Sequence, residues 1–162
     1  PYFRGHPDFM ASVTAYLSGR FGVSVDPTRE LVALAGSKEG LAELVLSHVD
    51  PGDVVLIPAV YYPVYARAPQ LAGATPVCVP LLDDGRLDLE AIEPSSLSRA
   101  RMLVVNYPSN PTTATISLAE YGRLIEFART HRLLLVSDLA YSELSYDGYT
   151  VPSVLEVPGA KE

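Results

Sequence analysis

Short apolar runs alternate along this chain with longer segments that are apolar on one side only. Short apolar runs bounded by turn residues are typical of buried strands, and apolar residues spaced three or four apart are typical of helices. The pattern predicts strands at residues 31–35, 54–57, 75–80, 102–105 and 133–136. It predicts helices at residues 8–20, 65–72, 87–92 and 118–129, and another that ends near residue 48. This alternation predicts an α/β fold with a mainly parallel sheet flanked by helices.

The best-defined unit is the β-α-β crossover at residues 102–136. Its first strand ends at the segment NYPSNPT (106–112), and its second strand is followed by Asp138 and Tyr141. Such crossovers are right-handed and place the two strands parallel in one sheet, so both polar endings lie at the same edge. Ligands of open α/β sheets bind outside the carboxyl ends of the strands. We therefore expect a carboxylate, a phenol and a carboxamide to converge there.

A candidate anion site lies at the start of the helix that ends near residue 48. Gly36, Ser37 and Lys38 join the strand predicted at 31–35 to this helix, whose first N–H groups and dipole favour an anion. The spacing matches neither a Walker A loop nor the dinucleotide fingerprint, so it gives no support for ATP or NAD. An ordinary N-cap, in which Ser37 holds the first turn, is the alternative interpretation.

Aromatic and amide side chains follow other predicted strands. Tyr62, with Tyr61 and Tyr65 beside it, is placed to stack on a flat heterocycle, and core packing is the alternative. For Asn106 and Asn110 the alternative is a turn, and for Asp138 a helix N-cap. Unrelated structural roles would scatter over both edges of the sheet, whereas these groups share one edge. Their placement predicts a ligand with a phosphate, a flat ring, a ring oxygen that accepts hydrogen bonds, and a ring nitrogen.

Composition excludes several classes of function. Of the 162 residues, 48% are hydrophobic and 19% are charged, as in globular domains. The net charge of −7 argues against a nucleic-acid surface, which needs clustered lysines and arginines. No apolar run approaches the roughly 20 residues of a transmembrane helix. Cys78 lies in a predicted strand and is interpreted as a buried packing thiol. We expect a cytoplasmic protein with no metal site and no nucleic-acid or membrane partner.

Six segments of the chain match a known family in their order and spacing. They are GSKEG (36–40), DPGDVVLIP (50–58), YPVY (62–65), LAGA (71–74), NYPSNPT (106–112) and SDLAYSEL (137–144). Over nearly its whole length the chain resembles the fold-type I aminotransferases of classes I and II, which depend on pyridoxal phosphate (PLP). It is most similar to the branch that contains LL-diaminopimelate, aspartate and alanine-type aminotransferases.

The resemblance implies contacts with two parts of the cofactor. Ser37 and Lys38 would contact the PLP phosphate, and Tyr62 would stack on the pyridine ring. Tyr2 matches a tyrosine that reaches the phosphate of the partner subunit in this family.

The remaining matches imply how the ring is held and tuned. Asn110 and Tyr141 would hydrogen-bond the phenolic oxygen of the ring, and Asp138 would pair with the pyridine nitrogen. A carboxylate at that nitrogen keeps it protonated, which lets the ring accept electrons during catalysis. Asp138 and Tyr141 are therefore the residues to which the resemblance gives catalytic roles.

Two features depart from the family pattern. Thr113 stands where the family usually has glycine, so we expect the loop to differ slightly. The family's covalent lysine, in a Ser-x-Ser-Lys segment, and its substrate-binding arginine both correspond to positions beyond this chain. Lys38 and Lys161 are not credible substitutes, because one lies on the phosphate loop and the other on the exit tail.

These matches predict that residues 1–162 form part of a large, PLP-binding domain, without the C-terminal part of that domain or the small domain. The intact protein would be a homodimer that transfers an amino group from an amino acid to a 2-oxo acid. The chain alone is expected to be inactive, because the covalent lysine is missing. Two alternatives stay open: a PLP-dependent carbon–sulfur β-lyase, and a non-catalytic binding module on the same scaffold.

Overall fold

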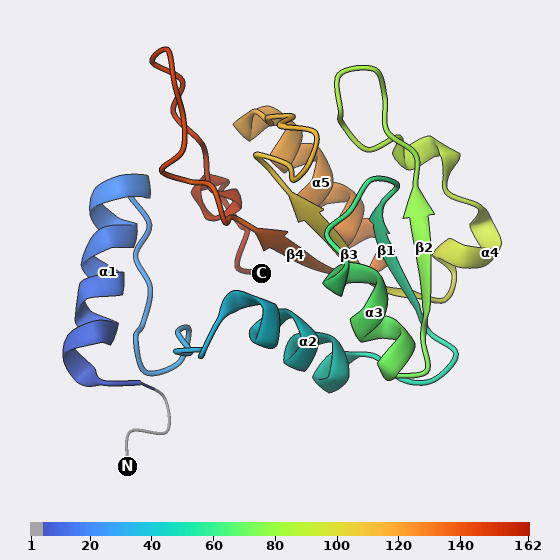
Figure 1. Cartoon of the computed structure of the whole chain (residues 1–162), viewed down its shortest axis with the longest axis horizontal. Coiled ribbons are helices and arrows are strands. Elements are labelled where there is room, and N and C mark those ends of the chain that lie inside the picture. The colour runs from blue at the N-terminus through green and yellow to red at the C-terminus, as the bar shows by residue number, and fades with distance from the viewer. Residues whose placement is uncertain (1–4) are drawn as a thin grey trace.

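A four-stranded parallel sheet forms the centre of the computed structural model, which describes residues 5–162 (Figure 1). Its strands are β1 (Val54–Pro58), β2 (Thr75–Val79), β3 (Ala100–Asn106) and β4 (Leu134–Asp138). They lie in the order β2-β1-β3-β4, and the β3–β4 register ends with Asn106 opposite Asp138. The predicted fold class is confirmed, and every predicted strand except the first forms close to its predicted bounds.

Helices cover both faces of this sheet. They are α1 (Pro7–Phe21), α2 (Ser37–His48), α3 (Val64–Leu71), α4 (Pro94–Leu97) and α5 (Leu118–His131), with 3₁₀ turns at Leu89–Ala91 and Val154–Glu156. Helices α2 and α3 pack together on one face, and α5 packs on the other. None of the described helices is long and apolar enough to cross a membrane.

Strands β1 and β3 are buried on both faces, which explains their unbroken apolar sequences. Successive side chains of a strand point to opposite faces. Val55 and Ile57 of β1 accordingly belong to the core under α2 and α3, whereas Val54 and Leu56 belong to the core under α5. The two cores therefore share the same short strands, and those strands hold their carboxyl ends firmly in place.

The order of the strands creates a crevice between β1 and β3. The crossover through α3 leads from β1 outward to β2, and the crossover through α5 leads from β3 outward to β4. The two connections diverge, so they leave the carboxyl ends of β1 and β3 uncovered. Such a switch point is where ligands of open α/β sheets bind.

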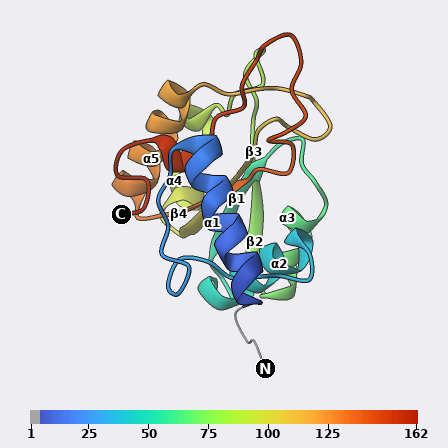
Figure 2. The same cartoon turned by 90° about the vertical axis from the view of Figure 1, so that its left-hand side faces the viewer.

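Helix α1 stands apart from the sheet, on the side where β4 forms the edge (Figures 1 and 2). Its last residue, Phe21, forms a small apolar cluster with Val23, and Leu139 packs against this cluster. The Arg20 guanidinium lies 3.2 Å from a carboxylate oxygen of Glu143. These contacts fasten α1 to the segment that follows β4.

Three predictions from the sequence are wrong. Residues 31–35 pair with no strand among the described residues, and Val32 is 71% exposed. An extended segment becomes a strand only beside another strand that takes up its hydrogen bonds. Cys78 is exposed, because it lies on the edge strand β2, where the neighbouring Val79 is covered and Cys78 is not. The helix predicted at 87–92 shrinks to one 3₁₀ turn, since the chain becomes extended before Pro94.

Candidate active site

A cavity of about 210 Å³ lies at the carboxyl ends of β1, β3 and β4. Its lining comes from the start of α2, the start of α3 and the segments that follow these strands. The lining residues are Ser37, Lys38, Leu41, Tyr62, Tyr65, Asn106, Asn110, Asp138, Ala140 and Tyr141. The structure thus brings the predicted site residues together, apart from Tyr2, which lies outside the described residues.

The cavity has two halves of different construction. We call Tyr65, Asn106, Asn110, Asp138 and Tyr141 the carboxylate half, because they surround Asp138 at the ends of β3 and β4. Ser37, Lys38 and Tyr62 form the helix half, at the N-terminus of α2.

A buried amide organises the carboxylate half. The Asn106 Nδ2 group donates to the backbone carbonyl of Asp138 at 2.8 Å. Its Oδ1 atom accepts from the backbone N–H of Asn110, also at 2.8 Å. Since Asn106 is only 5% exposed, water competes little for these bonds. One side chain therefore sets the positions of Asn110 and Asp138 relative to each other.

A buried phenol holds the Asp138 carboxylate. The Tyr65 hydroxyl donates to Asp138 Oδ2 at 2.7 Å. Burial and, next, this hydrogen bond to a carboxylate raise the pKa of Tyr65 well above its usual value. Tyr65 is therefore a protonated donor throughout the neutral range.

The helix half offers positive charge and the start of a helix. Ser37 is the first residue of α2, and the preceding Gly36 makes no side-chain cap. The alternative in which Ser37 is the N-cap is therefore wrong, and its hydroxyl makes no capping bond. The Lys38 Nζ atom lies 5.6 Å from the centroid of the Tyr62 ring, which is a cation–π distance. This half is exposed at Ser37 and Lys38.

The loop after β3 is tightly turned around Asn110. The backbone N–H of Thr113 donates to the carbonyl of Ser109 at 2.8 Å, and the N–H of Ser109 donates to the carbonyl of Ala114 at 2.9 Å. Thr113 has a φ of 60°, in the left-handed region that favours glycine. Thr113, which stands where the family usually has glycine, is therefore the residue of this loop whose side chain strains the backbone.

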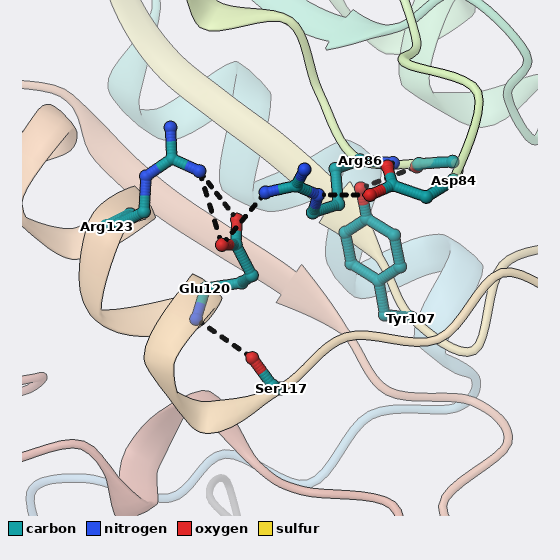
Figure 3. A network of polar contacts seen from close by, with 7 residues as sticks. Asp84, Arg86, Tyr107, Ser117, Glu120 and Arg123 are labelled. Atoms are coloured by element: carbon teal, nitrogen blue, oxygen red, sulfur yellow. Dashed lines mark hydrogen bonds and ion pairs between the residues drawn. The ribbon is translucent and has the colours of Figure 1, made fainter.

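A network of polar contacts joins Tyr107, at the start of this loop, and the turn around Arg86 to the first residues of α5 (Figure 3). The Tyr107 hydroxyl donates to the carbonyl of Gly85 at 3.1 Å, and burial raises the pKa of Tyr107 to about 12. Arg86 contacts Asp84 at 2.6 Å and Glu120 at 3.0 Å. The network ties the turn at Gly85 to the start of α5, and the loop that holds Asn110 leads from Tyr107 to that helix.

Two residues of the carboxylate half were not predicted as site residues. Tyr65 was expected only to accompany Tyr62, and Asn106 only to open the loop. A signal existed for Asn106, because it ends β3 directly opposite Asp138 in the register. For Tyr65 the signal is weak, because its partner lies 73 residues away and on a strand that is not adjacent to β1.

A family profile decides the affiliation of the chain. The profile described as aminotransferase class I and II matches residues 1–161. The chain belongs to this aminotransferase family. The resemblance inferred from its motifs is thereby confirmed.

Relatives within the aminotransferase family match the whole chain. The LL-diaminopimelate aminotransferase of Desulforudis audaxviator is 48% identical over 164 aligned residues, which cover 100% of this chain and 42% of that protein. The LL-diaminopimelate aminotransferase of Moorella thermoacetica is 44% identical with the same coverage. The chain therefore spans less than half the length of the curated relatives that it matches.

Solved aminotransferase structures share the fold. A probable N-succinyldiaminopimelate aminotransferase from Thermus thermophilus superposes with a TM-score of 0.89 at 40% identity, over 94% of this chain and 41% of that one. The apo form of BacF from Bacillus subtilis gives a TM-score of 0.94 at 34% identity, over 98% and 43%.

The donor set of the cavity fits PLP, the cofactor of this aminotransferase family. Lys38 and the N-terminus of α2 suit a phosphate. The ring of Tyr62 suits an aromatic face, and the Asp138 carboxylate suits a protonated ring nitrogen. The cavity places positive charge in its helix half and negative charge in its carboxylate half, and PLP has the complementary order of charges.

Proposed function

We propose that the intact protein is a PLP-dependent aminotransferase, and that residues 1–162 supply the part of its large domain that binds the phosphate and the ring. The observation that supports this proposal most strongly is that one cavity is lined by Ser37, Tyr62, Asn110, Asp138 and Tyr141. These groups come from separate segments, yet each has the chemistry that one portion of PLP requires. Bound PLP supplies an electron sink for the carbanion that forms beside the substrate nitrogen.

Each residue has a definite task in this proposal. Asp138 pairs with the ring nitrogen and holds its proton, while Asn110 and Tyr141 donate to the phenolic oxygen. Tyr62 covers one face of the ring and excludes water from it. Ser37 and Lys38 bind the phosphate. Tyr2 keeps its predicted role toward the partner subunit's phosphate.

The names of the relatives support transfer of an amino group rather than elimination. They support an amino acid and a 2-oxo acid as substrates, with LL-diaminopimelate as the first amino donor to test. The length of the relatives supports the absence of the family's lysine and small domain from residues 1–162. A cytoplasmic homodimer is the proposed form of the intact protein.

Equilibrium binding tests the cofactor proposal. Pyridoxamine phosphate, the amine form of the cofactor, is the suitable ligand because it cannot condense with Lys38 or Lys161. We expect saturable binding to the purified chain, measured by calorimetry, and at least tenfold weaker binding for Asp138→Ala, because a charged hydrogen bond is lost. Asp83→Ala, which removes an exposed carboxylate from a turn, is the matched control and should bind like the unaltered chain.

Two results would contradict the proposal. One is the absence of saturable binding, and the other is equal affinity for Asp138→Ala and the unaltered chain. The expectation of inactivity has its own assay, in which the chain is mixed with LL-diaminopimelate and 2-oxoglutarate. Glutamate formation above the background of the free cofactor would show that residues 1–162 suffice for turnover.

A further inference from the structure

The hydroxyl of Tyr65 is directed at the carboxylate of the cavity. We propose that Tyr65 is a positioning residue, which holds the carboxylate of Asp138 in the orientation that receives a protonated heterocyclic nitrogen. This inference rests on the proposed function, because it concerns how Asp138 meets the ring of the cofactor. It adds a residue to the site that acts on the ring through Asp138.

The hydrogen bonds around Asp138 divide its oxygen atoms between separate tasks. Oδ2 accepts from the Tyr65 hydroxyl at 2.7 Å, and the backbone carbonyl accepts from Asn106 at 2.8 Å. Among the described residues, no hydrogen bond to Oδ1 is found, and Asp138 lines the cavity. The backbone and one carboxylate oxygen are thus fixed by protein donors, and the other oxygen is left for a ligand.

The position of Tyr65 in the fold makes this bond difficult to replace. Tyr65 belongs to α3, which follows β1, and Asp138 ends β4, so the side chain reaches across β3. It packs in the same apolar core as Val104 and Val136 and is only 3% exposed. A hydroxyl held in such a core has little freedom to find another acceptor, so its direction is set by packing.

The chemistry of Tyr65 favours positioning over proton transfer. Burial and the Asp138 carboxylate both raise the pKa of Tyr65, so the phenol keeps its proton. An acid–base catalyst works best with a pKa near the working pH, which this environment prevents. A donor that keeps its proton at neutral pH is suited to holding a carboxylate in one orientation.

The ring of Tyr65 has a second contact that can be separated from the hydroxyl. It meets the ring of Tyr62 edge to face, with centroids 6.1 Å apart and an interplanar angle of 73°. Tyr65→Phe removes the bond to Asp138 and keeps this ring contact. The substitution therefore isolates the proposed role.

The test compares two ligands that differ at one atom. Pyridoxamine phosphate has the ring nitrogen, and its 1-deaza analogue has carbon in that place. We expect Tyr65→Phe to weaken binding of pyridoxamine phosphate about tenfold, because a hydrogen bond to a charged group is lost, and to change binding of the 1-deaza analogue less than about twofold. The unaltered chain should prefer pyridoxamine phosphate, and Tyr65→Phe should lose most of this preference.

Tyr121→Phe is the matched control. It removes another buried tyrosine hydroxyl, which lies 3.3 Å from Ser137 Oγ and is not part of the cavity lining. Its ratio of affinities for the two ligands should equal that of the unaltered chain. A change confined to Tyr65→Phe would therefore be specific to the bond with Asp138 and not to the loss of a buried hydroxyl.

The possible outcomes separate this inference from the proposed function. If the unaltered chain binds neither ligand, both fail. If the unaltered chain prefers pyridoxamine phosphate and Tyr65→Phe keeps the full preference, only the inference about Tyr65 fails. Should Tyr65→Phe not fold, the hydroxyl proton resonance of Tyr65 is followed by NMR in the unaltered chain. That resonance should shift with pyridoxamine phosphate and stay in place with the 1-deaza analogue, and equal shifts would overturn the inference.

Discussion

The two halves of the cavity reach the same ligand site by different physical means. In the carboxylate half, Asn106 and Tyr65 are 5% and 3% exposed and hold Asp138 by hydrogen bonds of 2.7–2.8 Å. In the helix half, Ser37 and Lys38 are exposed, and Lys38 approaches Tyr62 only at the 5.6 Å of a cation–π contact. Buried hydrogen bonds hold the carboxylate half without a ligand, whereas among the described residues the exposed side chains of Ser37 and Lys38 have no such bonds.

This difference follows from what each half recognises. The hydrogen bond to a pyridine nitrogen is strong in one direction only, so the partner carboxylate has to be held in place before the ring binds. A phosphate is large, symmetrical and doubly charged, so backbone N–H groups and one lysine can bind it in several similar arrangements. Substitutions in the carboxylate half should therefore have larger effects than those in the helix half.

Asn106→Ala is expected to change the free energy of unfolding more than the other substitutions. The backbone N–H of Asn110 and the carbonyl of Asp138 would lose their buried partner, which should lower the free energy of unfolding by about 3 kcal/mol. Urea unfolding at neutral pH measures this loss. Asn106→Asp keeps the acceptor for Asn110 but turns a buried carboxylate oxygen toward the carbonyl oxygen of Asp138, so at neutral pH it should be at least as unstable as Asn106→Ala. A loss below about 0.5 kcal/mol for Asn106→Ala would mean that water satisfies these groups and that the half is not preorganised.

Thr113→Gly is expected to change stability by a smaller amount and in the opposite direction, toward a more stable chain. Thr113 has a φ of 60°, which a β-branched residue tolerates poorly and glycine adopts freely. Thermal unfolding should show a gain of about 1 kcal/mol. Thr115→Gly is the control, because Thr115 is also exposed and has no positive φ, so the same change should destabilise the chain. Equal effects of the two substitutions would show that the loop holds no strain at Thr113.

Ser37→Ala, in the helix half, is expected to have the smallest effect on the stability of the chain. The hydroxyl makes no capping bond, so the free energy of unfolding should change by less than about 0.5 kcal/mol. Affinity for pyridoxamine phosphate should fall about threefold, because one neutral hydrogen bond to the phosphate is lost and the backbone N–H groups remain. A loss in affinity as large as that of Asp138→Ala would contradict the proposed order of the two halves.

The sequence predicts the elements whose signals are local. The strands that end at Asn106 and Asp138 are short apolar runs with polar residues directly after them, and the crossover rule places both ends at one edge. The assignment of Asp138 and Asn110 to one site follows from that rule. The same apolar signal fails at residues 31–35, because composition does not reveal whether a neighbouring strand is present.

Contacts between distant segments are the part that the sequence does not predict. The bond from Tyr65 to Asp138 depends on the angle at which α3 packs against β1 and β2. That angle is set by the fit of many side chains in the core and not by any motif around Tyr65. The burial of β2 on one face only is likewise a property of the sheet order, which is why Cys78 was assigned to the wrong environment.

The pairing of Asn106 with Asp138 limits how this gene segment can change in length. Side chains alternate between the faces of a strand, so the deletion of one codon inside β4 would turn Asp138 away from the cavity and abolish its contact with Tyr65. Codons gained or lost in the turn between α5 and β4 would leave the pairing intact, whereas the loop before α5 carries Asn110 of the cavity. Evolution can therefore lengthen or shorten the turn after α5, while within Leu134–Asp138 it is confined to exchanging one amino acid for another.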